Sequence, residues 1–217
     1  MNLVQLASHT VDLDLLPEAP RVLDAGCRDF DFTAAVLEHR PRSYVYALDP
    51  GPDLCPPPPL MQRYPDALIH FSNRALVGSP RFKARLFTGS TGHGDFLSEL
   101  QSYYDMIPIE VHCVTLSELG GPNPFDFWDL VKLDIEGSEF EVLERWPGPI
   151  ARQISVEFHD WNQPHTCYSE TYWRELFTHL GKFGYRVVQH ELSRQGNGVG
   201  HWDSLIVLDD AKWTSGG

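Results

Sequence analysis

Apolar and polar residues alternate in several short segments of the chain, and most of these segments are followed by apolar residues at helical spacing. The clearest case places Val131, Leu133 and Ile135 on one face of a strand. Helical spacing then runs from Phe140 until a Pro-Gly-Pro sequence at 147–149 ends the helix. Strands that alternate with helices are typical of a mostly parallel sheet.

The same patterns predict the remaining elements. Strands are expected at 21–26, 43–50, 67–71, 81–87, 109–114 and 154–159, and helices at 32–39 and 170–182. Segments 185–192 and 201–208 flank a glycine-rich loop, which indicates an antiparallel pair of strands at the C-terminal end. The four prolines at 56–59 cannot donate backbone hydrogen bonds, so we expect an extended loop at 51–59 and no helix before Leu60.

Length and charge narrow the fold and the function. The 217 residues fit one domain over 1–217, with a core at about 21–208, better than they fit two. A net charge of −13 repels a phosphate backbone, so we expect no nucleic-acid partner. The start of the chain lacks a signal-peptide pattern, and no run approaches the roughly 20 apolar residues needed to span a bilayer. We therefore expect a cytoplasmic α/β protein with a Rossmann-like sheet and no membrane partner.

Carboxylates stand where several predicted strands end. Asp24 closes the first strand and Asp49 closes the second, while Asp134 and Glu136 stand at the carboxyl end of the strand that contains Val131 and Leu133. In open α/β sheets ligands bind outside the carboxyl ends of the strands, so these acids are candidate ligand-binding residues. The turn at 24–30 keeps only the first glycine of the dinucleotide fingerprint G-x-G-x-x-G, which favours a positively charged cofactor such as S-adenosylmethionine.

Two other functions remain open at this point. The position of Asp49 suits the ribose of NAD as well as that of S-adenosylmethionine, so a nicotinamide-dependent oxidoreductase is an alternative. The incomplete glycine fingerprint and the expected antiparallel end count against it. The third possibility is a relative that binds a cofactor without catalysing a reaction.

The strand at 154–159 predicts an acceptor site. Its alternation puts Ser155, Glu157 and His159 on one face, and Glu157 and His159 then approach the same rim as Asp134. Histidine has an unperturbed pKa near neutrality, so we expect His159 to act as general base, oriented by Asp134 or Glu157. The same three side chains could instead hold a divalent cation. Because no spacing fixes such a geometry, we prefer a mechanism without metal. Lys132, in a strand that is otherwise apolar, is expected to pair with a carboxylate or reach the surface.

Six segments, in this order along the chain, carry a resemblance to a known family. They are V-L-D-A-G-C-R-D-F-D-F-T, A-L-D-P, S-N-R-A-L, V-T-L-S-E-L, V-K-L-D-I-E-G-S-E-F-E-V-L-E and I-S-V-E-F-H. With them the chain resembles the FkbM-type methyltransferases over roughly Val22 to Leu208, and the fifth segment is the most specific. The resemblance implies a class I methyltransferase that uses S-adenosylmethionine, with O-methylation of a sugar, polyketide or similar small molecule.

The resemblance also implies residue roles. Asp24 and Gly26 would border the methionine end of the cofactor, Asp49 would hold its ribose, and Asn73 would lie near its adenine. Asp134 would face the centre of methyl transfer. Phe30 takes the place of the family's second glycine, so we expect a reshaped turn at the methionine end. Loops 51–59 and 88–94 are expected to shape the acceptor pocket.

Overall fold

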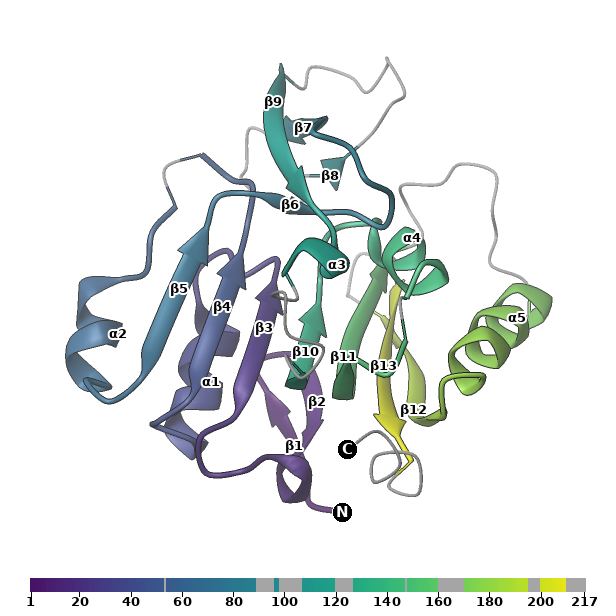
Figure 1. The fold of residues 1–217 in the computed structure, drawn as a ribbon, viewed down its shortest axis with the longest axis horizontal. Coiled ribbons are helices and arrows are strands. Elements are labelled where there is room, and N and C mark those ends of the chain that lie inside the picture. The colour runs from purple at the N-terminus through teal and green to yellow at the C-terminus, as the bar shows by residue number, and fades with distance from the viewer. Residues whose placement is uncertain are drawn as a thin grey trace.

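The computed structural model describes residues 1–52, 54–88, 96–97, 107–119, 127–146, 148–159, 170–194 and 200–209. At its centre lies a seven-stranded sheet (Figure 1). The strands of this main sheet are β3 (Arg21–Ala25), β4 (Tyr44–Leu48), β5 (Leu68–Ser72), β10 (Trp128–Leu133), β11 (Ala151–His159), β12 (Tyr185–Arg194) and β13 (Gly200–Leu208). Their order across the sheet is β12-β13-β11-β10-β3-β4-β5.

The strand directions confirm a mostly parallel sheet with an antiparallel C-terminal pair. Strands β11, β10, β3, β4 and β5 are parallel neighbours, whereas β13 is antiparallel to both β11 and β12. Strand β3 lies between β4 and β10. The chain therefore adds β4 and β5 on one side of β3, and later adds β10 and β11 on the other side. Such a switch in strand order opens a crevice at the carboxyl ends of the strands, where ligands bind in α/β proteins.

The alternating apolar residues of the central strands pack against different layers on the two faces. Helix α1 (Asp31–His39) covers one face, and helices α4 (Glu139–Glu144) and α5 (Glu170–Gly181) cover the other. In β3, for example, Val22 belongs to the core beneath α1, whereas Leu23 belongs to the core beneath α4 and α5. None of the helices in the described ranges is long and apolar enough to cross a membrane.

Helix α2 (Pro58–Arg63) begins earlier than the sequence predicted. The expectation that no helix starts before Leu60 is wrong, because Pro58 and Pro59 occupy the first turn. Residues at the first positions of a helix need no intrahelical donor, so prolines fit there. The short helix α3 (Leu116–Leu119) matches no expected element.

The strands expected at 81–87 and 109–114 do form, but they do not extend the main sheet. They correspond to β7 (Lys83–Thr88) and β9 (Ile107–Val114), which pair antiparallel in a second sheet. This sheet also contains β6 (Ala75–Leu76) and β8 (Phe96–Leu97), in the order β6-β9-β7-β8. Figure 1 places it at the top of the view, beyond the ends of β4 and β5. The second sheet therefore stands over the crevice.

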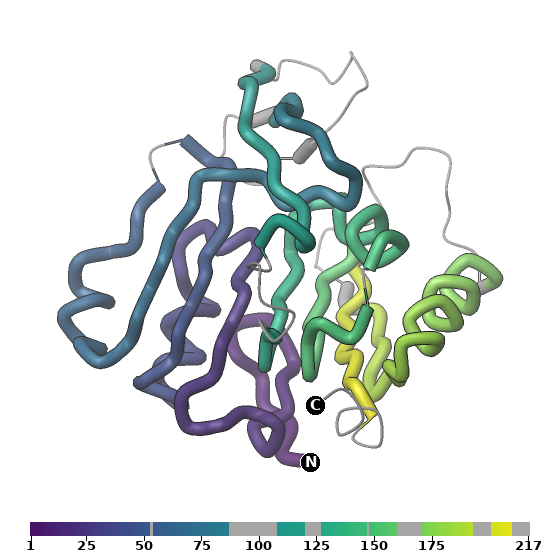
Figure 2. Tube along the Cα trace, viewed as in Figure 1, coloured from purple at the N-terminus to yellow at the C-terminus, as the bar shows by residue number. Residues whose placement is uncertain are grey.

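An N-terminal hairpin, absent from the expected elements, packs on the main sheet. It consists of β1 (Leu3–Leu6) and β2 (His9–Asp12), which the purple trace of Figure 2 follows, and a short 3-10 helix at Leu13–Leu15 comes next. All four residues of β2 are buried. The side chain of Gln153 in β11 accepts from the Asp12 backbone N–H at 2.9 Å and donates to the Asp12 carbonyl at 3.0 Å. A polar residue of the central sheet thus replaces the strand partner that β2 lacks on this side.

Phe30, which takes the place of the family's second glycine, keeps the backbone conformation that glycine favours. Its φ is 67°, in the left-handed region. The side chain is 2% exposed, belongs to the core beneath α1, and contacts the ring of Phe71 edge to face at 5.7 Å between centroids. The ring therefore points into the core, and it does not crowd the cavity described below.

We predict that Phe30→Gly lowers the free energy of unfolding. Removing a buried ring costs about 3–5 kcal/mol, and relief of the left-handed backbone returns about 1–2 kcal/mol. The net loss, on the order of 2 kcal/mol, can be measured by denaturant unfolding. Phe82→Gly, at a side chain that is 75% exposed, is the control and should change stability little. A stabilised Phe30→Gly variant would contradict the assignment of the ring to the core.

Candidate active site

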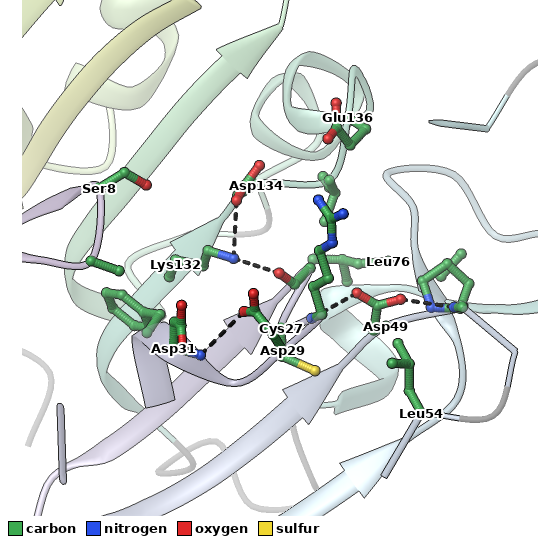
Figure 3. A pocket seen from close by; sticks show the side chains of 18 of the residues that line it. Ser8, Cys27, Asp29, Asp31, Asp49, Leu54, Leu76, Lys132, Asp134 and Glu136 are labelled. Carbon is green, nitrogen blue, oxygen red and sulfur yellow. Dashed lines mark hydrogen bonds and ion pairs between the residues drawn. The ribbon is translucent and has the colours of Figure 1, made fainter. Parts of the chain in front are cut away.

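A cavity opens where β3, β4 and β10 end (Figure 3). Its volume is about 400 Å³, which is within the range of small-molecule sites. Ala75, Leu76 and Leu86 of the second sheet supply part of its apolar wall. Gly51, Pro52 and Leu54 of the loop at 51–59 contribute to the lining, whereas residues 89–94 of the other loop expected at the acceptor lie outside the described ranges. Polar and glycine positions that line the cavity include Gly26, Asp29, Asp49, Lys132, Asp134 and Glu136.

Gly26 makes the turn after β3 fit against the end of β10. Its φ is 79°, and a Cβ on this residue would lie 1.7 Å from the carbonyl oxygen of Asp134. The Gly26 backbone N–H donates to the carbonyl of Leu48 at 2.8 Å, which ties the same turn to β4. Only glycine allows this close approach. Gly26 thus faces the cavity, as the sequence predicted, and also fixes the spacing of the strands around it.

Asp49 faces the cavity from the end of β4. Its two carboxylate oxygens accept backbone N–H groups, one from Arg28 at 2.9 Å and one from Gly51 at 2.8 Å. Burial raises the pKa of this carboxyl, although both backbone hydrogen bonds oppose the shift. Asn73 is not among the residues that line the cavity; its amide donates to the carbonyls of Asp49 and Gly51 at 3.3 and 2.5 Å. Asn73 therefore supports the turn that carries Asp49.

Asp24 lies beneath the cavity and does not line it. The residue is fully buried, and its Oδ2 accepts the hydroxyl of Thr33 at 2.6 Å. Lys132, which is 3% exposed, places its Nζ 3.4 Å from Asp24, 3.3 Å from Asp134 and 2.6 Å from the carbonyl oxygen of Gly26. Burial alone lowers a lysine pKa, but these two carboxylates raise the pKa of Lys132 above its usual range. Of the two outcomes expected for Lys132, pairing with carboxylates is confirmed.

A dense group of acids and histidines lies beside the cavity. We call it the acid–histidine cluster, and it comprises His9, Asp134, Glu136, Glu139, Glu157, His159, His201 and Asp203. The structure brings Asp134, Glu157 and His159 together, as the alternation in β11 predicted. His159 Nε2 lies 3.3 Å from Glu157, 3.6 Å from Glu136 and 3.8 Å from Asp134.

Glu139, at the start of α4, organises the loop between β10 and that helix. Its carboxylate is fully buried and accepts the backbone N–H groups of Ile135 at 2.8 Å and Gly137 at 2.9 Å. It also lies 3.1 Å from Nδ1 of His159. Glu139 thus orients the imidazole at Nδ1, in addition to Glu157 at Nε2; the sequence had named Asp134 or Glu157 for this role. The signal was present in the segment K-L-D-I-E-G-S-E, whose last acid occupies the first turn of the helix.

The electrostatics of the cluster give His159 a positive charge. Burial lowers the pKa of His159, but attraction and hydrogen bonding to Glu139 and to the neighbouring acids raise it to about 11. The ring therefore carries both protons at neutral pH, and general-base catalysis by His159 requires that the surrounding negative charge first be reduced. Burial opposes ionisation of Asp134 as well, yet Lys132 and His9 hold its pKa well below the usual range. Burial and the neighbouring acids raise the pKa of Glu136 to about 7.

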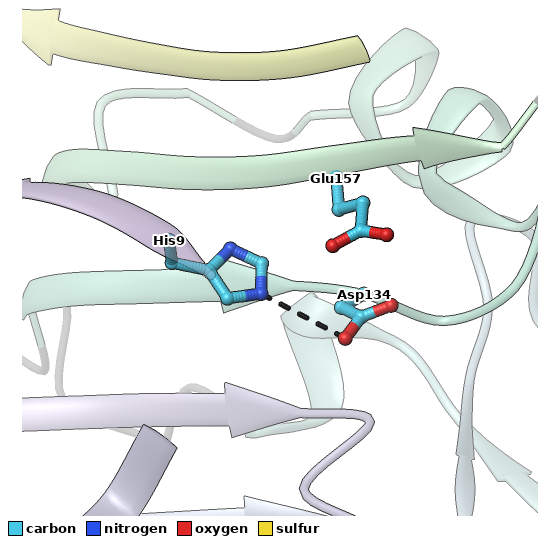
Figure 4. Close-up of side chains that lie close together, drawn as sticks. All are labelled: His9, Asp134 and Glu157. Carbon is cyan, nitrogen blue, oxygen red and sulfur yellow. Dashed lines mark ion pairs between the residues drawn. The ribbon is translucent and has the colours of Figure 1, made fainter. Parts of the chain in front are cut away.

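Two histidines of the cluster were not predicted from the sequence. His9 comes from β2 and faces Asp134 and Glu157 (Figure 4). His201 comes from β13, with Nδ1 3.3 Å from Glu157 and Nε2 3.5 Å from Asp203. No motif marks either residue. The signal available for His201 was its place at the start of the last expected strand, whereas the strand that carries His9 was itself missed.

Comparisons with known proteins place the chain in a family. The family model of the methyltransferase FkbM domain matches residues 24–187. No curated protein matches the sequence. One similar solved structure is 1,6-didemethyltoxoflavin-N1-methyltransferase from Burkholderia thailandensis, with 18% identity, a TM-score of 0.45, and coverage of 88% of this chain and 72% of that one.

Two further solved structures have similar scores. Magnesium protoporphyrin IX methyltransferase from Synechocystis PCC 6803 has 11% identity, a TM-score of 0.46, and coverage of 90% of this chain and 72% of that one. The antibiotic-resistance methyltransferase Kmr has 13% identity, a TM-score of 0.49, and coverage of 95% and 100%.

The family match covers Asp24 and Asp49, the turn that contains Gly26, and the part of the acid–histidine cluster between Asp134 and His159. The resemblance noted from the six sequence segments is confirmed. The chain belongs to the FkbM methyltransferase family, and S-adenosylmethionine is its methyl donor.

Proposed function

We propose that this methyltransferase acts on a hydroxyl oxygen of a small molecule, such as a sugar or a polyketide. The observation that carries the proposal is that the cavity and the acid–histidine cluster share His9, Asp134 and Glu136. A cofactor in the cavity and an acceptor against the cluster would meet at Asp134. Carboxylates and histidines are the groups that commonly bind a hydroxyl and accept its proton.

The residues around the cavity fit S-adenosylmethionine. At Gly26 the wall is backbone, because a Cβ has no room there. Each carboxylate oxygen of Asp49 accepts one backbone N–H and keeps a further lone pair, which would accept a ribose hydroxyl. The lining acids, among them Asp29 and Asp134, favour a positively charged sulfonium. In this arrangement Asp24 and Asn73 support the site from behind and would not contact the cofactor.

The bound cofactor supplies an activated methyl group, and the chain's own residues would position and deprotonate the acceptor. Asp134 and Glu157 have carboxylate oxygens near the edge of the cavity that would accept a hydrogen bond from the acceptor hydroxyl. We propose that the hydroxyl proton passes to the carboxylate of Glu157, because His159, which contacts Glu139, Glu157 and Glu136, already carries both ring protons. His159 then acts as the shared proton-carrying group between these carboxylates.

Charge supports a small acceptor over nucleic acid. The chain has a net charge of −13, and the rim of the cavity is lined with carboxylates. A phosphate backbone would be repelled by both. Membership of the FkbM family sets the nicotinamide-dependent alternative aside. Release of S-adenosylhomocysteine with a panel of sugar and polyketide alcohols distinguishes the proposed enzyme from a relative that binds the cofactor without turnover.

We predict that Asp49→Ala weakens binding of S-adenosylhomocysteine, measured by calorimetry. Each charge-assisted hydrogen bond to a ribose hydroxyl contributes about 1.5–3 kcal/mol, so the Kd should rise at least about tenfold. Asp49→Asn keeps one acceptor oxygen, so its Kd should lie between that of the unmodified chain and that of Asp49→Ala. Asp66→Ala, at an exposed acid outside the cavity, is the control. An unchanged Kd in Asp49→Ala would remove Asp49 from the ribose site.

We predict that His159→Ala reduces turnover while the affinity for S-adenosylhomocysteine stays within about twofold. Positioned proton transfer typically contributes 10²–10⁴-fold, and a loss of about that size in kcat is expected with an active acceptor from the panel. His39→Ala, at an exposed histidine in α1, is the control. Thermal melting of both variants checks that they fold. Full turnover by a folded His159→Ala variant would give His159 a purely structural role.

A further inference from the structure

We propose that His9, Asp134 and Glu157 bind a divalent metal ion at the edge of the cavity. The three side chains come from β2, from the loop after β10 and from β11 (Figure 4). One ligand atom from each of them lies within 4.8 Å of the other two. The site goes beyond the proposed function, which needs no metal, and its existence stands on this geometry alone.

The most direct indication is the environment of His9. The residue is 2% exposed, and its Nδ1 lies 3.4 Å from the hydroxyl oxygen of Ser155. Its Nε2 has no hydrogen bond to any residue within the described ranges. The nearest approach of Nε2 to an acid is 3.7 Å, to Asp134 Oδ2, which is beyond hydrogen-bonding distance. A buried ring nitrogen therefore points at two carboxylates, with an ion-pair contact to Asp134 and a hydrogen bond to neither.

Nε2 of His9 lacks a hydrogen bond to the described residues whether or not it carries a proton. If Nε2 carries a proton, that buried donor is unsatisfied; if Nε2 carries a lone pair, the lone pair faces the negative oxygens of Asp134 and Glu157. A cation between the three groups removes both problems. In the second state, Nδ1–H can donate to Ser155, which is the outer contact that usually orients a metal-bound histidine.

Two other groups of acids and histidines in the cluster place an acid within 3.5 Å of each ring nitrogen. His159 is placed between Glu139 at 3.1 Å and Glu157 at 3.3 Å, one at each ring nitrogen. His201 lies between Glu157 at 3.3 Å and Asp203 at 3.5 Å in the same way. His9 differs from both because one of its ring nitrogens faces acids at a distance that no hydrogen bond spans. The cation site is therefore assigned to the His9 group.

The donor set indicates the class of metal. One imidazole and two carboxylates suit Mn²⁺, Fe²⁺ or Zn²⁺ better than Cu⁺, which prefers sulfur, or Ca²⁺, which prefers oxygen alone. Ligand bonds of about 2.0–2.2 Å place ligand atoms at most about 4.4 Å apart, so small side-chain movements close the site. If the proposed function holds, a cation here would also bind the acceptor oxygen and lower the pKa of its hydroxyl.

The proposal is tested by measuring Mn²⁺ binding to the full chain. The protein is first freed of metal with EDTA and dialysed. We expect one saturable Mn²⁺ per chain by calorimetry, and a histidine nitrogen coupled to Mn²⁺ in electron spin echo spectra. His9→Asn should raise the Kd for Mn²⁺ at least about tenfold and abolish the nitrogen coupling. His39→Asn should change neither. The spectrum of the unmodified chain keeps the proposal testable even if His9→Asn does not fold.

Two results would overturn the cation site. One is the absence of saturable Mn²⁺ binding to the unmodified chain, and the other is an unchanged Kd and nitrogen coupling in a folded His9→Asn variant. Binding of S-adenosylhomocysteine is measured on the same samples. If the cofactor binds and Mn²⁺ does not, the cation site is wrong and the proposed function is unaffected. If Mn²⁺ binds and the cofactor does not, the proposed function is wrong and the cation site is unaffected.

Discussion

A buried lysine between two strand-end carboxylates is the interaction on which the rest of the site depends. Lys132 in β10 is the register partner of Asp24 in β3, and its Nζ lies within 3.4 Å of Asp24 and 3.3 Å of Asp134. In a low-dielectric interior, two carboxylates at the ends of neighbouring strands repel each other strongly unless a cation lies between them. Lys132 also donates to the carbonyl of Gly26, so the same ammonium group holds the turn against β10.

Beyond Lys132, the negative charges of the acid–histidine cluster are balanced by histidines that come from distant parts of the chain. The cluster collects side chains from β2, the loop after β10, α4, β11 and β13, which become neighbours only when the sheet and the hairpin are assembled. Each of His159 and His201 lies between two carboxylates. A buried charge left without its partner is costly, so the integrity of the site and the packing of the hairpin on the sheet are coupled.

The parallel strands, their order along the chain and the strand-end acids were predictable, because they depend on local alternation and on the rule that parallel strands end at one edge. The contacts of Asp134, Glu157 and His159 followed from the same rule. The hairpin was not predictable in this way, because β2 buries His9, Thr10 and Asp12, and polar residues carry no apolar alternation. Gln153, 141 positions away, satisfies the backbone of Asp12, whose carboxylate accepts the backbone N–H groups of Asn2 and Asp14.

The positions of Asp24 and Phe30 show a different limit. The sequence assigned Asp24 to the cofactor and expected Phe30 to reshape the first turn, since residues in that turn commonly face a ligand. The structure directs both side chains inward, Asp24 to Thr33 and Lys132, and Phe30 to Phe71. Phe30 turns inward from a backbone position with a left-handed φ of 67°, and Asp24 lies in β3 with its side chain buried between the strands and α1. No pattern of residue types specifies that angle.

The carboxylate of Glu139 has a consequence for how this enzyme can diversify. By accepting the N–H groups of Ile135 and Gly137 and contacting His159, it fixes the edge that bears Asp134 before any ligand arrives. Dipoles and charges held in place in advance need no reorganisation during the reaction. Mutations in the walls that contact the acceptor can therefore alter which acceptor fits, while the electrostatics of the reacting edge stay constant.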